Sequence, residues 1–79
     1  MDETIRTVLA EHARLGVDPQ AIDENTDLFD AGMTSHASVN VMLALEDAFD
    51  IEFPESMLKK STFESIAAIR AGLLALTAA

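Results

Sequence analysis

Cysteine, tryptophan and tyrosine are absent from this chain of 79 residues. Without cysteine the protein can form no disulfide framework, no thiolate metal site and no thiol nucleophile. The aromatic residues are four phenylalanines, so the core must be built mainly from aliphatic side chains. A domain of this size buries a small core. That core is therefore not reinforced by covalent cross-links.

Basic residues are scarce: five Lys and Arg stand against 14 Asp and Glu, which gives a formal net charge of −9. Such a surface repels phosphate backbones and anionic lipids, so neither nucleic acid nor a membrane is an expected partner. It favours proteins that present basic patches. No Lys or Arg occurs between Leu15 and Leu58, a stretch that holds ten of the acidic residues.

Long apolar runs are also missing. None approaches the roughly 20 residues that cross a bilayer, and the N-terminus, Met1-Asp2-Glu3, lacks the apolar core of a signal peptide. Hydrophobic residues nevertheless make up 49% of the chain, which argues against disorder. We therefore expect one domain over residues 1–79, a cytoplasmic monomer, with little room for a deep enzyme cleft.

Apolar residues at helical spacing predict an all-α fold. The expected elements are three main helices and one short helix, at about 2–15, 35–50, 54–60 and 62–76, with the short one third in order. A long loop at 16–33 separates the first two. No strand signal competes with this pattern. The predicted architecture is a small irregular helical bundle.

The predicted helices have expected ends and faces. Gly16 should end the first helix, Pro54 should begin the short one, and Thr62 should cap the last. The second helix should turn its apolar residues inward: Val39, Met42, Leu43 and Phe49, with Leu45 toward the flank. The long loop needs apolar anchors, for which the candidates are Val17, Ile22, Leu28 and Phe29.

The loop contains one pattern that resembles a calcium-binding site. Asp23, Asn25 and Asp27 alternate as in an EF-hand loop. However, the sixth position of such a loop is Leu28 rather than glycine, and the twelfth is Thr34 rather than glutamate. We therefore predict no metal site.

The stretch from Gly32 to Val39 holds the strongest candidate site. Thr34 and Ser35 lie where the second helix should begin, and both are helix-capping residue types. Ser35 can be interpreted as an ordinary cap, worth about 1 kcal/mol, or as the attachment point of a phosphodiester. The second interpretation is physically sound because a helix N-terminus favours phosphate.

The sequence Gly-Met-Thr-Ser-His-Ala-Ser-Val at 32–39 resembles the Gly-Leu-Asp-Ser-Leu-x-Ser-Val segment of acyl carrier proteins. The likeness continues through 43–54 and loosely to both termini. It implies an acyl-carrier-protein-like bundle in which Ser35 bears 4'-phosphopantetheine, attached by a phosphopantetheinyl transferase. Ser38 matches the second serine of the family motif, which is not modified.

Two departures from that motif indicate which subclass of carrier protein the chain resembles. Thr34 and His36 replace the usual Asp and Leu. With them, the chain looks more like small bacterial carriers loaded by amino acid:carrier protein ligases, which are truncated homologues of seryl-tRNA synthetases. The implied function is to hold an aminoacyl or acyl thioester for a downstream transferase. A fatty-acyl or polyketide-type carrier, or an unmodified helical interaction module, remains the alternative, and the cargo stays open.

No catalytic residues are predicted. His36 is the immediate neighbour of Ser35 rather than a positioned base, and no paired acid and base are evident. We expect a non-catalytic carrier whose partners dock beside Ser35. The hypothetical docking residues are Thr34, His36, Val39, Met42, Glu46 and Asp47.

Overall fold

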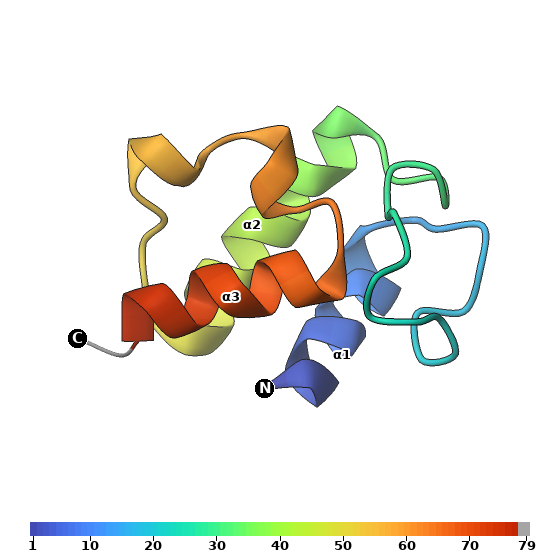
Figure 1. Ribbon diagram of the computed structural model, residues 1–79, viewed down its shortest axis with the longest axis horizontal. Helices are drawn as coiled ribbons and strands as arrows, with labels where there is room; N and C mark the ends of the chain where they lie inside the picture. The colour runs from blue at the N-terminus through green and yellow to red at the C-terminus, as the bar shows by residue number, and fades with distance from the viewer. Residues whose placement is uncertain (78–79) are drawn as a thin grey trace.

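A computed structural model describes residues 1–77; residues 78 and 79, the end of the predicted domain, lie outside the described residues. The elements in chain order are α1 (Asp2–His12), α2 (Ser35–Phe49), the 3₁₀ turns η1 (Glu55–Met57) and η2 (Lys60–Thr62), and α3 (Ile66–Thr77). Helix α1 packs against both α2 and α3 (Figure 1). Residues 1–77 contain no strand, so the all-α prediction is confirmed.

The core is aliphatic, as the composition predicts. Every α-helix contributes to it, and so does the long loop. The largest fully buried side chains are Ile5, Leu9, Leu28, Val41, Leu45, Ile66, Ile69 and Leu73. Two rings complete it, because Phe53 and Phe63 meet edge to face with centroids 5.3 Å apart. No helix within residues 1–77 is long and apolar enough to cross a membrane.

Helix α1 ends at His12, three residues before the predicted end. Gly16 does not end it, so that prediction is wrong. The chain reverses at Arg14, which has a left-handed φ of 55°. Gly16 instead lies in the loop, where its N–H donates to the Ala31 carbonyl at 2.9 Å and joins the two ends of the loop.

The inward face of α2 differs from the prediction. The buried residues of this helix are Ala37, Val41 and Leu45. Val39 and Leu43 are 49% and 52% exposed, and Met42 and Phe49 are half-buried. The helix is apolar around most of its circumference, so several stripes satisfy helical spacing. Contact with α1 and the loop selects the stripe that is buried.

The segment between α2 and α3 also corrects two predictions. The short helix expected at 54–60 is replaced by two 3₁₀ turns, which are separated by Leu58 and by Lys59, the latter in an extended conformation. Thr62 is buried in η2 and does not cap the last helix. The hydroxyl of Ser65 accepts from the Ala68 N–H at 3.0 Å instead, so α3 begins four residues later than expected.

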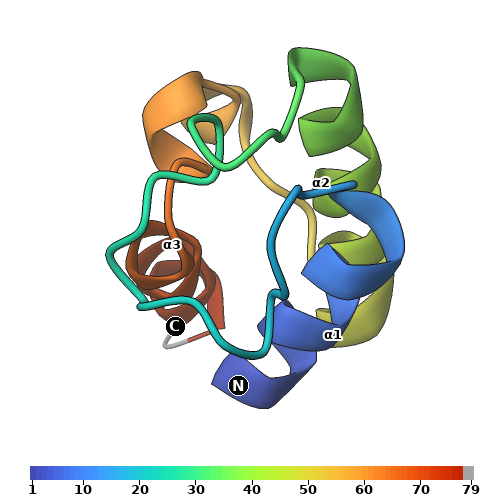
Figure 2. The same ribbon diagram turned by 90° about the vertical axis from the view of Figure 1, so that its right-hand side faces the viewer.

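The long loop runs from the end of α1 past α3 to the start of α2 (Figure 2). It is held by backbone hydrogen bonds and by the buried side chains of Leu28 and Met33. Of the four predicted anchors, Leu28 is fully buried, and Ile22 and Phe29 are half-buried and pack against the core. Val17 is 46% exposed, so that anchor was wrong. The Leu28 N–H donates to the Glu64 carbonyl at 2.8 Å, which joins the loop to the start of α3.

Two arginines add polar attachments to the same loop. Arg6 donates from Nη1 to the carbonyls of Pro19 and Ile22 at 2.9 and 2.7 Å. Arg70 on α3 pairs with Glu24 at 2.9 Å and with Asp2 at 2.7 Å. The hydrogen bond with Glu24 and the charges of both carboxylates raise the pKa of the Arg70 guanidinium. These contacts connect the loop to α1 and α3.

Candidate functional site

The N-terminus of α2 is capped by Thr34. This residue is extended (φ −84°, ψ 165°), and its hydroxyl accepts from the Ala37 N–H at 3.0 Å. Its carbonyl accepts from the Ser38 N–H at 2.9 Å. One side chain therefore supplies the N-cap. Ser35 is the first residue of the helix and is not needed for that role.

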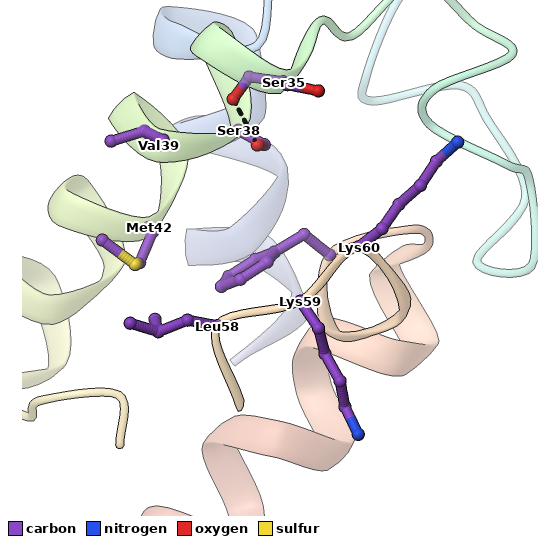
Figure 3. Close-up of a pocket in the computed structure, with 8 residues that line it drawn as sticks. Ser35, Ser38, Val39, Met42, Leu58, Lys59 and Lys60 are labelled. Carbon is purple, nitrogen blue, oxygen red and sulfur yellow. Dashed lines mark hydrogen bonds between the residues drawn. The ribbon is translucent and has the colours of Figure 1, made fainter. Parts of the chain in front are cut away.

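The Ser35 hydroxyl is exposed and forms no hydrogen bond with any other side chain or backbone group of residues 1–77. The interpretation of Ser35 as an ordinary cap is therefore wrong. The competing hydroxyl, Ser38, donates to the Ser35 carbonyl at 2.6 Å (Figure 3), as expected for a serine one turn into a helix. Of the two serines, Ser35 alone presents an unengaged nucleophilic oxygen.

The turn before Thr34 explains the glycine of the motif. Gly32 has φ +119°, a conformation that side chains rarely adopt. A Cβ at this position would lie 3.2 Å from the Gly16 backbone nitrogen. The Gly32 N–H donates to the Phe29 carbonyl at 3.1 Å, and the next residue, Met33, is buried. Anchoring on both sides thus fixes where α2 begins.

A groove of about 320 Å³ starts at Ser35 and lies between α2 and the segment 58–63. It is lined by Ser35, Ser38, Val39, Met42, Leu58, Lys59, Lys60 and Phe63. In Figure 3, Val39 and Met42 come from α2 and Leu58 comes from the opposite side. The walls are thus largely apolar, with a hydroxyl at one end.

The electrostatics around Ser35 suit an anion. The first turn of α2 contains no acidic residue. The free N–H groups at the start of a helix carry partial positive charge. Lys60, which lines the groove, has its ammonium 4.9 Å from the centroid of the Phe29 ring. Sequence reasoning did not select Lys60, although Lys59 and Lys60 are the only Lys or Arg residues between Arg14 and Arg70.

The predicted docking residues form two groups. Thr34, His36, Val39 and Asp47 are exposed on α2 or at its start, and Met42 is half-buried in the groove wall. Glu46 is half-buried, and its Oε2 accepts from the Phe53 N–H at 2.9 Å. Glu46 therefore also holds the chain that leaves α2, a role that sequence reasoning did not identify.

Two carboxylates of the calcium-like pattern accept hydrogen bonds from the backbone of their own loop. Asp23 Oδ1 accepts from the Asn25 N–H at 2.8 Å, and Asp27 Oδ1 accepts from the Phe29 N–H at 2.9 Å. Such contacts are typical of Asx turns. Across residues 1–77, no group of three or more His, Asp or Glu side chains is arranged to hold a metal ion.

The chain matches one protein-family model and is similar to a known carrier protein. Residues 3–69 match the family model described as "Phosphopantetheine attachment site". The chain is 46% identical over 69 residues to the aminoacyl carrier protein of Agrobacterium fabrum, a match that covers 87% of this chain and 83% of that protein.

Two solved structures share the fold. One is the crystal structure of engineered Bradyrhizobium japonicum glycine:carrier protein ligase complexed with carrier protein from Agrobacterium tumefaciens and AMP. The matching chain has a TM-score of 0.90 and is 44% identical in sequence. That match covers 92% of this chain and 97% of that one. The complex of the Bradyrhizobium ligase with glycylated carrier protein gives a TM-score of 0.76 and 25% identity over 90% of this chain and 95% of that one. The acyl-carrier-protein-like fold is confirmed.

Proposed function

The chain belongs to the family of phosphopantetheine-binding carrier proteins, and on that premise we propose that Ser35 is the residue that bears the arm. The protein is a non-catalytic carrier, and its cofactor is 4'-phosphopantetheine. Because the chain has no cysteine, the thiol that holds the cargo must come from the arm. The observation that carries the assignment is the free Ser35 hydroxyl beside a helix already capped by Thr34.

Physical chemistry supports this position for the modification. A phosphodiester on Ser35 would lie at the open end of α2, where backbone N–H groups and the helix dipole favour negative charge. The hydroxyl is exposed, so a phosphopantetheinyl transferase can reach it. Among residues 1–77 no side chain forms a hydrogen bond with this hydroxyl that would activate it, so the transferase must supply the base.

Mass spectrometry of the intact protein tests the assignment. After incubation with coenzyme A, Mg²⁺ and a phosphopantetheinyl transferase, the wild type should gain the mass of one phosphopantetheine group. Ser35→Ala should gain none, and the matched control Ser38→Ala should behave as the wild type does. Modification of Ser35→Ala would refute the assignment. A wild type that stays unmodified with several transferases would favour the unmodified interaction module.

We propose that the cargo is an amino acid, loaded by an amino acid:carrier protein ligase and passed to a downstream acyl or aminoacyl transferase. Support comes from the 46% identity to an aminoacyl carrier protein and from the likeness to a glycylated carrier protein. Because such loading consumes ATP, we propose that the protein acts in the cytoplasm. We also propose that it is a single-domain monomer. Incubation of the holo protein with glycine or alanine, ATP and the ligase should add one aminoacyl mass. Exclusive loading by a fatty-acyl ligase would instead establish the alternative.

The docking face proposed for these partners comprises Thr34, His36, Val39, Met42, Glu46 and Asp47. Asp47 gives its cleanest test, because it is exposed and accepts no hydrogen bond within the described chain, whereas Glu46 also binds the Phe53 N–H. Asp47→Lys should weaken ligase loading through charge reversal, most strongly at low salt. Loading that is unchanged by this substitution would remove Asp47 from the face.

A further inference from the structure

Lys60 is a cation without a carboxylate partner among residues 1–77 of this strongly acidic protein. The chain has 14 acidic and five basic residues, yet the ion pairs found within residues 1–77 involve Arg70 and His12 only. The Lys60 ammonium lies over the Phe29 ring, 4.9 Å from its centroid. An exposed cation–π contact is weak, so an anion within reach of the lysine can draw the ammonium away from the ring.

The place of Lys60 relative to Ser35 suggests that partner. Both residues line the same groove. Phe29 belongs to the turn that leads into α2, because the Gly32 N–H donates to its carbonyl. In Figure 3 the Lys60 side chain extends toward this loop, whereas the Lys59 side chain extends toward α3. Of the two adjacent lysines, Lys60 is therefore the one whose charge lies beside the loop that leads into α2.

We propose that Lys60 binds the phosphodiester of the arm on Ser35. This inference rests on the proposed modification of Ser35. The phosphodiester carries one negative charge, and lysine binds phosphate as a flexible point charge. When the arm is attached, the ammonium leaves the Phe29 ring and pairs with a phosphate oxygen. The N–H groups at the start of α2 face the same anion.

The pairing has a structural consequence for the arm. Its phosphate end is held at the mouth of the groove, while its thiol end stays free to reach partner enzymes. Since both charges are accessible to water, salt must weaken the contact. Lys60 is thus a positioning residue for the arm, separate from the docking face on α2.

NMR of the holo protein tests the proposal with Lys60→Gln and the matched control Lys59→Gln. In the wild type and in Lys59→Gln, conversion from apo to holo should shift the ring protons of Phe29. Lys60→Gln should lose most of that shift. The ³¹P resonance of the arm should move between low salt and about 1 M NaCl, where the Debye length falls to about 3 Å, but not in Lys60→Gln. Lys60→Arg should retain both responses because it keeps the charge.

Intact mass separates the possible failures. If the wild type gains no phosphopantetheine, the proposed function fails and the Lys60 inference fails with it. If all variants gain the arm, and Lys60→Gln gives the same apo-to-holo shifts and the same salt response as Lys59→Gln, only the Lys60 inference is overturned. Circular dichroism of each variant shows whether its helices are intact, and Lys60→Arg gives a second comparison should Lys60→Gln unfold.

Discussion

Thr34 and Ser35 are adjacent hydroxyl residues at the start of one helix, yet they should respond to substitution in opposite ways. Thr34→Ala removes the oxygen that accepts from the Ala37 N–H at 3.0 Å. Ser35→Ala removes an exposed hydroxyl with no partner among the described residues. The first change should affect stability, and the second should affect modification.

The expected magnitudes follow from these contacts. Loss of a Thr N-cap costs about 1 kcal/mol, with a range of roughly 0.5–2. For a domain of this size, 1 kcal/mol lowers the melting temperature by roughly 4–8 °C. Ser35→Ala breaks no hydrogen bond of its side chain, and alanine has the higher helix propensity, so stability should change by no more than about 0.5 kcal/mol.

Urea unfolding followed by circular dichroism measures the first property, and intact mass after phosphopantetheinylation measures the second. Thr34→Ala should be destabilised but still gain the arm. Ser35→Ala should keep wild-type stability and gain nothing. If Ser35→Ala loses as much stability as Thr34→Ala, the division between cap and attachment residue is refuted.

Three further substitutions test the surroundings of the site. Gly32→Ala should cost about 1–3 kcal/mol in urea unfolding, because a residue with φ +119° strains any side chain. Glu46→Ala should cost about 1–3 kcal/mol, because it leaves the part-buried Phe53 N–H without its acceptor. Arg70→Gln should lower the melting temperature and speed amide exchange at Ala67, whose N–H donates to the Glu24 carbonyl.

Each of these has a matched control. Gly16→Ala should be tolerated, since its Cβ would meet only the Ala31 carbonyl at an ordinary 3.6 Å. Asp47→Ala controls for Glu46→Ala, and Arg14→Gln controls for Arg70→Gln, because Asp47 and Arg14 are exposed. A control that costs as much as its partner would show that the named contact is not the cause.

Local sequence was sufficient to predict the helical class and to identify Ser35 as the candidate. A glycine followed by two hydroxyl residues before an apolar helix is a short-range signal, and capping depends on neighbours within one turn. The resemblance to acyl carrier proteins rests on the same contiguous residues and their following helix. None of this needs the rest of the chain in place.

Tertiary contacts decided what local patterns left ambiguous. Helix α2 offers several apolar stripes, and only packing buries Val41 while exposing Val39 and Leu43. Thr62 and Ser65 are both capping types, and burial of Thr62 leaves Ser65 to cap α3. The sequence alone identified Ser35 as the hydroxyl proposed to bear the arm. Only folding brings Lys60, 25 positions later, into the groove beside it, because that proximity is made by packing rather than by chain neighbours.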